Sequence, residues 1–176
     1  MTSLLRAGTC SVRTSSAGRL YDAVASLLAL RQESSYEAQA AMQLEQIAAP
    51  SAAAAYPFTL IEPTGEGAMP VEVDWRPAVA GILEDLGRGT GIATVAGRFH
   101  RTLAQMIAAV AEWAGLPRVV LTGGFFQNAS VASLAARELA RRRFEVVTHR
   151  RIPPNDGGLA VGQALVAGSQ LLARGD

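Results

Sequence analysis

The last third of the sequence alternates short apolar segments with amphipathic segments, and this alternation constrains the fold more than any other feature. Short runs with apolar residues at 119–122 and at 144–149 predict two strands. Each predicted strand is followed by residues at helical spacing, over 130–143 and over 158–172. Strands and helices that alternate with short connections are typical of an α/β layer in which the strands are at least partly parallel.

The first part of the chain is predicted to hold helices and one hairpin. Helices are expected over 17–30 and 35–48, and the spacing of Ser34 and Glu37 is typical of a capping box that opens the second helix. A connector rich in Ala and Pro at 48–55 leads into strands at 56–62 and 71–75, joined by a turn at 63–67. We therefore expect a single domain over residues 1–176, with a helical segment at about 17–48 and an α/β core at about 56–174.

Two more helices are expected between the hairpin and the α/β layer. The first covers 77–86. The second is the longest of the chain, because an apolar stripe runs from Ile92 to Val110. Thr90 is its expected cap, and Gly115 and Pro117 are its stop signals.

The charge and the cysteine content exclude several classes of function. A net charge of +1 gives no basis for binding nucleic acid or an anionic membrane, and the run 141–143 of three arginines is expected to close a helix instead. All 16 basic residues are arginine, so chemistry that needs a lysine cannot reside in this chain. The single cysteine, Cys10, cannot form an internal disulfide. Because no signal peptide and no apolar segment of membrane-spanning length is visible, a cytoplasmic protein is expected.

Two connections are candidates for ligand binding, because ligands of α/β proteins collect at the carboxyl ends of strands. After the strand at 119–122, Gly123 and Gly124 let the backbone approach a ligand with no Cβ in the way. The following helix would present unpaired amide groups to the same space, which favours a phosphate or a nucleoside. Asn128 at the mouth of this helix offers a donor and an acceptor. The alternative is an ordinary strand-to-helix turn in which Asn128 caps the helix.

The second connection follows the strand at 144–149 and contains the run Pro-Pro-Asn-Asp-Gly-Gly at 153–158. The prolines stiffen the chain, and the glycines again open the backbone. The Asp156 carboxylate would lie at the sheet edge, where it can bind a metal, orient a hydroxyl or cap the final helix. The residues alone leave these roles open.

Five blocks of the sequence resemble, in order, the corresponding blocks of the HypF-type carbamoyltransferases of hydrogenase maturation. They extend from residue 14 to near the C-terminus, and their order makes the resemblance far more specific than any single block. The blocks are TSSAGRLYDAV at 14–24, SYEAQAAM at 35–42, RFH at 98–100, TGGFFQN at 122–128 and HRRIPPNDGG at 149–158.

This resemblance implies a fold, an activity and partners. The chain is expected to be the second lobe of an actin/sugar-kinase (ribonuclease H-like) fold, which is an α/β fold with a mixed sheet and flanking helices. HypF proteins form carbamoyl-adenylate from carbamoyl phosphate and ATP. They pass the carbamoyl group to the C-terminal cysteine of HypE, where it becomes a cyanide ligand of nickel–iron hydrogenases. The implied partners are HypE and a first lobe, either on a separate chain or on the rest of a HypF polypeptide.

The resemblance also implies which residues form the nucleotide site. Gly123, Gly124 and Asn128 would contact the adenosine and the phosphate of the adenylate. Asp22 would accept hydrogen bonds from the ribose hydroxyls. Glu37 is a further candidate in the same pocket, beside its interpretation as part of a capping box.

A metal site is implied as well, with Asp156 as one ligand of a single divalent metal, iron or zinc. The family takes a pair of histidines, spaced i and i+4, from its first lobe, and neither His100 nor His149 has such a partner. Each of these histidines is expected to be structural or to form hydrogen bonds. Ala38 also stands where the family has glycine. The remaining metal ligands would therefore lie outside this chain, because one carboxylate is not a competent metal site.

Three functions stay open. The first is half of a carbamoyltransferase, inactive alone because its first lobe is absent, with Asp22, Asn128 and Asp156 on one concave face. The second is a non-catalytic remnant or interaction module that binds no AMP even beside a first lobe. The third, a threonylcarbamoyl transferase acting on tRNA, is disfavoured by the run at 153–158 and by the lack of a basic cluster. Apolar surface left by a missing lobe predicts a homodimer or a heteromer.

Overall fold

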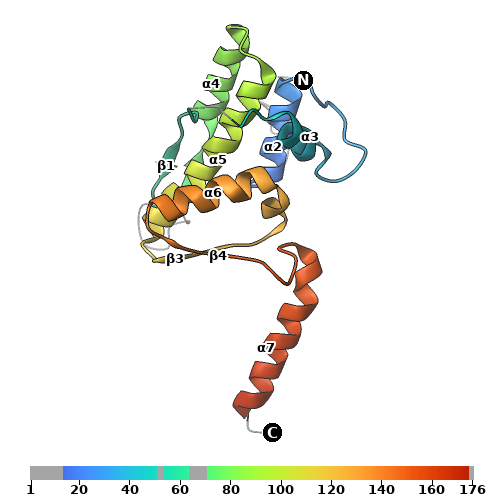
Figure 1. The fold of residues 1–176 in the computed structure, drawn as a ribbon, viewed down its shortest axis with the longest axis vertical. Coiled ribbons are helices and arrows are strands. Elements are labelled where there is room, and N and C mark those ends of the chain that lie inside the picture. The colour runs from blue at the N-terminus through green and yellow to red at the C-terminus, as the bar shows by residue number, and fades with distance from the viewer. Residues whose placement is uncertain (1–13, 51–53, 64–70, 175–176) are drawn as a thin grey trace.

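The computed structural model describes residues 14–50, 54–63 and 71–174, and it begins with a helical pair. Helices α2 (Ala17–Leu27) and α3 (Gln39–Ile47) pack against each other, and α3 also packs against the long helix α5 (Figure 1). The second helix starts later than predicted because Ala38 adopts a left-handed conformation with φ of 61°. The Gln39 side chain accepts a hydrogen bond from the Ser35 amide at 2.8 Å. The helix thus begins beyond Glu37, and the predicted capping box was wrong.

A short antiparallel hairpin follows. Strands β1 (Thr59–Ile61) and β2 (Glu72–Asp74) pair with Leu60 opposite Val73. Both lie inside the predicted segments, and the antiparallel pairing agrees with the predicted hairpin. Most of the predicted turn at 63–67 lies outside the described residues.

Helix α5 (Ile92–Ala114) follows α4 (Arg76–Gly87) and forms the centre of the fold. Gly91, not Thr90, is its N-cap residue, and the Thr90 amide instead donates to the Asp85 carbonyl at 2.9 Å. The helix ends at Gly115 with φ of 66°, as predicted, because glycine adopts this left-handed conformation without strain. At 23 residues, α5 is long enough to contribute to two cores.

Two hydrophobic cores lie along α5. The first is formed by α2, α3, α4 and the N-terminal half of α5. The second is formed by the C-terminal half of α5 together with the last α/β segment. Fully buried members include Val24, Leu44, Ile82 and Val95 in the first core and Ala108, Ala135 and Leu139 in the second.

The predicted α/β layer is confirmed in its order and in its strand direction. Strand β3 (Arg118–Leu121), the 3-10 turn η1 (Gly124–Gln127), helix α6 (Ala129–Arg141) and strand β4 (Glu145–Thr148) follow one another. Strands β3 and β4 are parallel, and α6 packs on α5. The strand pairings in the described residues form two separate two-stranded sheets, one antiparallel and one parallel.

The end of α6 explains the run of arginines. Arg141 and Arg142 both hydrogen-bond to Glu138, one turn earlier, at 2.7 and 2.9 Å. Arg143 then takes a positive φ of 68°, which turns the chain into β4. The run closes the helix, as predicted.

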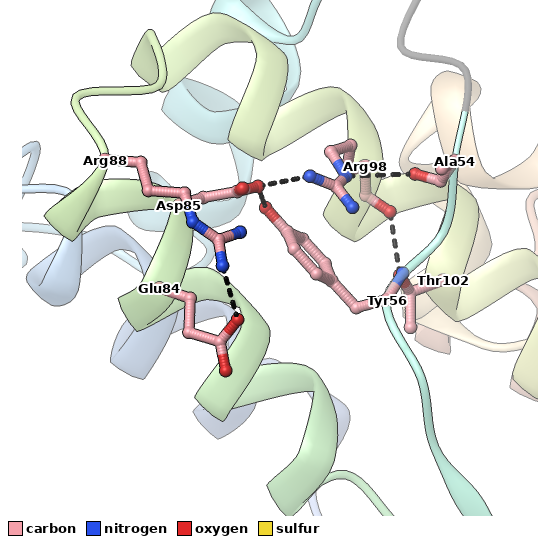
Figure 2. Close-up of polar contacts among 7 residues, drawn as sticks. All are labelled: Ala54, Tyr56, Glu84, Asp85, Arg88, Arg98 and Thr102. Carbon is pink, nitrogen blue, oxygen red and sulfur yellow. Dashed lines mark hydrogen bonds and ion pairs between the residues drawn. The ribbon is translucent and has the colours of Figure 1, made fainter.

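A buried polar network fixes the segment before β1 against α4 and α5 (Figure 2). The Tyr56 hydroxyl donates to Asp85 at 2.6 Å, and the Arg98 guanidinium donates to the same carboxylate oxygen at 2.5 Å. The Arg98 guanidinium also lies over the Tyr56 ring, 4.4 Å from its centroid. The Tyr56 amide donates to the Thr102 hydroxyl at 2.8 Å.

The last helix is separate from this body. After η2 (Asp156–Gly158), helix α7 (Leu159–Arg174) extends away from the other elements (Figure 1). Its large apolar side chains are exposed: Leu159, Val161, Leu165, Val166, Leu171 and Leu172. On the parallel sheet, Val120 and Val147 pair in register and are also exposed. None of the helices in the described residues combines the length and the hydrophobicity that a membrane span requires.

Candidate functional site

The two predicted ligand connections lie together at the carboxyl edge of the parallel strands. Strand β3 ends at Leu121 opposite Thr148 of β4. One residue further on each chain segment, the Thr122 hydroxyl and His149 Nε2 lie 2.8 Å apart. The Gly123 amide donates to the Pro154 carbonyl at 2.7 Å. These two contacts tie the first connection to the second.

The glycines of the first connection have different local roles. Gly123 has φ of 98°, a conformation that favours glycine, and its amide is engaged by Pro154. It would therefore contribute open space to a ligand rather than a donor. Gly124 is the first residue of η1, so its amide has no partner within that turn.

The N-terminus of α6 is less open than the sequence indicates. The Ser130 amide donates to Glu45 of α3 at 2.8 Å, and the Val131 amide donates to the Asn128 side chain at 2.9 Å. The expectation that this helix presents unpaired amides to a ligand is therefore wrong for these two groups. Glu45 is a residue that sequence reasoning missed, because it lies 85 positions away from Ser130 in the chain.

Asn128 is the N-cap residue of α6, as the structural alternative predicted. It is 9% exposed, and its Nδ2 lies 3.4 Å from Nε2 of the buried His100 on α5. The cap and a ligand role are compatible, because a carboxamide can form more hydrogen bonds than these two.

The second connection is a tight turn that needs its glycines. Asn155 Oδ1 accepts from the Gly157 amide at 3.1 Å, and the Asn155 carbonyl accepts from the Gly158 amide at 2.9 Å. A Cβ on Gly158 would lie 2.9 Å from the Pro153 carbonyl oxygen. Asn155 is therefore the capping residue of η2, whereas capping by Asp156 was one of three roles that the sequence left open. The Asp156 side chain is exposed at the surface of the turn.

Asp22 and Glu37 lie on the helical side of the molecule. Asp22 forms an ion pair with Arg19, one turn earlier, at 2.8 Å, and its side chain is 34% exposed. Glu37 is exposed in the loop before α3. Tyr21 makes the contact between α2 and η1, with its ring centroid 6.0 Å from that of Phe125. The convergence of Asp22 and Glu37 with the two connections stays a prediction.

A cavity of about 580 Å³ lies beside the joined connections. It extends from the ends of β3 and β4 to the exposed side of α6. Its polar lining includes Gln127, Ser133 and His149, and the ring of Phe126 forms part of its apolar lining. The parallel register, in which 122 and 149 are equivalent positions, is the signal that could have linked His149 to this site.

The donor set of the described residues does not by itself fit a metal ion. Among the described residues, no group of three or more His, Cys, Asp and Glu side chains is placed to hold one. Asp156 offers one carboxylate at the edge of the second connection. The predicted iron or zinc site therefore depends on ligands from outside the described residues.

Comparison with known proteins identifies the family. A family model described as "Carbamoyltransferase, Kae1-like domain, second subdomain" matches residues 1–163. Carbamoyltransferase HypF of Synechocystis sp. is 37% identical over 154 residues, which are 86% of this chain and 19% of that protein. Carbamoyltransferase HypF of Rhodobacter capsulatus is 40% identical over 163 residues, which are 90% of this chain and 20% of that protein.

Solved structures of HypF have the same fold. A full-length HypF in a phosphate- and nucleotide-bound form superimposes with a TM-score of 0.84 at 31% identity, over 96% of this chain and 22% of that one. HypF of T. kodakarensis gives a TM-score of 0.73 at 27% identity, over 97% and 22% of the two chains. The chain thus spans about a fifth of the length of these relatives. It belongs to the HypF carbamoyltransferase family, within which it corresponds to the second subdomain of the Kae1-like domain.

Proposed function

We propose that this chain supplies one wall of the nucleotide site in a carbamoyltransferase that acts on carbamoyl-adenylate. The carbamoyl group would pass to the C-terminal cysteine thiol of HypE, for the synthesis of the cyanide ligand of nickel–iron hydrogenases. In that transfer the thiol loses its proton to water, its sulfur bonds to the carbamoyl carbon, the bond from this carbon to the phosphate oxygen breaks, and AMP leaves. The observation that carries the proposal is that the hydrogen bond from the Gly123 amide to the Pro154 carbonyl joins the two connections beside the cavity of about 580 Å³.

Family membership and the local geometry support this proposal. A full-length HypF has been solved in a phosphate- and nucleotide-bound form, which supports a nucleotide as the ligand. Gly123 has no heavy atom within 4 Å of the position that a Cβ would take, so a ligand can approach the backbone there. The Gly124 amide starts a helical turn and is suited to a phosphate oxygen.

Side chains would complete the nucleotide site. Asn128 would bind the adenosine through the donor and acceptor positions of its carboxamide that the helix cap does not use. Asp22 would accept hydrogen bonds from the ribose hydroxyls once its ion pair with Arg19 opens. Glu37 is exposed and therefore accessible to the same ligand. Asp156 would be one ligand of a divalent metal, which polarises an oxygen when bound. Preorganised amides near the reacting group would stabilise negative charge on the leaving phosphate.

The rest of a HypF-type polypeptide, or a separate first-lobe chain, would supply the opposite wall. Ligand sites are concave and need more than one wall, whereas this cavity is open to solvent. The exposed apolar side chains of α7 and of the parallel sheet are surfaces that such a partner would cover. We therefore expect weak binding of AMP by this chain alone and tighter binding beside a first lobe.

Calorimetry with AMP tests the proposal, with and without a first-lobe polypeptide that carries the two-histidine helix. We expect the assembled pair to bind AMP, and Asp22→Asn to weaken that binding about tenfold, since a charged hydrogen bond is lost. Glu84→Gln is the matched control, because this carboxylate lies on the exposed side of α4 and pairs with Arg88. Mass spectrometry of HypE would show a carbamoylated C-terminal cysteine. An assembled pair that binds no AMP would favour the alternative, a non-catalytic interaction module of the same fold.

A further inference from the structure

Asn128 is held in one orientation by two contacts of opposite polarity. Its Oδ1 must face the Val131 amide, which can only donate, at 2.9 Å. Its Nδ2 consequently faces His100, with 3.4 Å between Asn128 Nδ2 and His100 Nε2. A carboxamide flipped by 180° would place a donor against the Val131 amide and lose the helix cap.

His100 can take the matching acceptor role only in one protonation state. Its Nδ1 lies 2.7 Å from the Ala96 carbonyl, and because a carbonyl can only accept, Nδ1 carries the proton. In the neutral ring Nε2 is then an unprotonated acceptor for the Asn128 amide. Burial lowers the pKa of His100, opposed in part by the bond to Ala96 and by the charge of Glu45. The neutral ring is therefore favoured in the folded protein.

The surroundings of His100 add rigidity and charge. Its side chain is 1% exposed, and its ring packs edge-on against Tyr21 of α2 at a centroid distance of 5.6 Å. Glu45 of α3 lies close enough to influence the pKa of both Tyr21 and His100, and it also accepts from the Ser130 amide at 2.8 Å. A second cavity of about 370 Å³ has His100, Arg101 and Arg137 among its lining residues.

We propose that His100 is a positioning residue for the nucleotide site, which fixes the Asn128 carboxamide so that its second Nδ2 hydrogen and its second Oδ1 lone pair are available to the adenosine. Glu45 assists by holding the neighbouring turn of α6. This inference rests on the proposed nucleotide role of Asn128, but the positioning itself can be measured without a nucleotide.

Nitrogen-15 NMR of the complete chain tests the positioning. In wild type we expect His100 to be protonated at Nδ1 and unprotonated at Nε2 at neutral pH, and the spectrum of His100→Gln assigns its signals, since the chain has two histidines. The Asn128 side-chain amide signals should shift when acidification protonates His100, because Nε2–H then faces a donor. A proton on Nε2 at neutral pH, or Asn128 signals that ignore the titration of His100, would overturn the proposal.

Variants separate positioning from packing. His100→Gln keeps an acceptor near the position of Nε2, so the Asn128 signals should persist and lose their acid transition. His100→Leu removes the acceptor, so the signals should move at every pH. Leu103→Val is the matched control, since this residue is buried on the same helix, and it should leave the Asn128 signals and the His100 tautomer unchanged. If His100→Leu does not fold, the acid transition of the Asn128 signals in wild type, compared with its absence in His100→Gln, still tests whether His100 positions Asn128.

AMP binding by the chain assembled with a first-lobe polypeptide gives the functional arm. We expect His100→Leu to weaken binding about tenfold, in line with the loss of one hydrogen bond, and His100→Gln to bind nearly as wild type does. If wild type binds no AMP, the proposed function fails, and the NMR result still decides whether His100 orients Asn128. Equal affinities of wild type and His100→Leu would overturn a positioning role in nucleotide binding.

Discussion

At the scale of single residues, a few buried polar side chains with hydrogen-bond partners inside the protein help to organise the interior of this molecule. Asp85 is the clearest case, because its side chain is 8% exposed and receives bonds from both Tyr56 and Arg98. Burial and the bond to Asp85 raise the pKa of the Tyr56 hydroxyl, so it stays protonated and donates. A buried carboxylate depends on such donors, since an unpaired charge in a core is costly.

Tyr56→Phe tests this dependence. The variant removes one of the two donors to Asp85 and should lower the free energy of unfolding by about 2 kcal/mol, as for a hydrogen bond to a charged group. Urea unfolding followed by circular dichroism measures the change. Tyr36→Phe is the control, because Tyr36 is 53% exposed, and its effect should stay within about 0.5 kcal/mol. Equal stabilities of the two variants would contradict the role of the network.

At the scale of the elements, the sequence predicted which segments form helices and strands better than it predicted where they start. The order of the last four elements and their parallel pairing follow from local apolar patterns and from the handedness of short connections. The caps predicted for α3 and α5 were wrong because nearby side-chain and backbone partners accept hydrogen bonds from the amides there. The Gln39 side chain accepts a hydrogen bond from the Ser35 amide, and the Asp85 carbonyl accepts one from the Thr90 amide. Both partners lie within five residues along the chain, and a capping pattern does not show which of these local groups accepts the hydrogen bond.

The contact of α4 with the segment before β1 gives an element-scale prediction. A Cβ on Gly81 would lie 2.7 Å from Cδ1 of Tyr56, a ring that is held at its hydroxyl by Asp85 and cannot move away freely. Gly81→Ala should therefore destabilise the protein by about 1–3 kcal/mol in urea unfolding, as overpacking does, despite the better helix propensity of alanine. Gly87→Ala in the same helix meets nothing within 4 Å and should be neutral or stabilising. An increase in the free energy of unfolding of Gly81→Ala would show that the segment around Tyr56 moves to make room for the added methyl group.

At the scale of the whole molecule, the sequence located the edge that holds the candidate site but not the detail of its bonds. The run at 122–128 and the run at 149–158 do meet, through Gly123 and Pro154. Local patterns offered Asn128 as the cap of α6, but they could not show that Glu45 also accepts from an amide there, since Glu45 comes from a helix in the other core. The proposed roles of Asp22 and Asp156 depend on a first lobe that would form the opposite wall, and local spacing does not encode that relation.

The separation of α7 from the body gives a whole-molecule prediction. A chain that ends at Gly158 should keep the unfolding free energy of the full chain to within about 0.5 kcal/mol, because the α7 side chains make little buried contact. Leu139→Ala is the positive control, since truncation of this fully buried side chain should lower the free energy of unfolding by about 2–5 kcal/mol. Urea unfolding of the full chain, of the truncated chain and of Leu139→Ala measures these differences. A large loss of stability on truncation would show that α7 packs on the body in solution.

The exposure of α7 also determines how this end of the molecule can associate. With 16 residues and few supporting contacts, the helix is close to the length at which isolated helices are marginal in water. Its backbone amides should therefore exchange with solvent faster than those of α5, and we expect a partner that covers the helix to slow this exchange. Association would then be coupled to folding, with a negative heat-capacity change and an entropic penalty that offsets part of the gain from burying its leucines and valines. The affinity for the rest of a HypF-type enzyme would accordingly respond to substitutions that alter helix propensity in α7, even where they touch no partner atom.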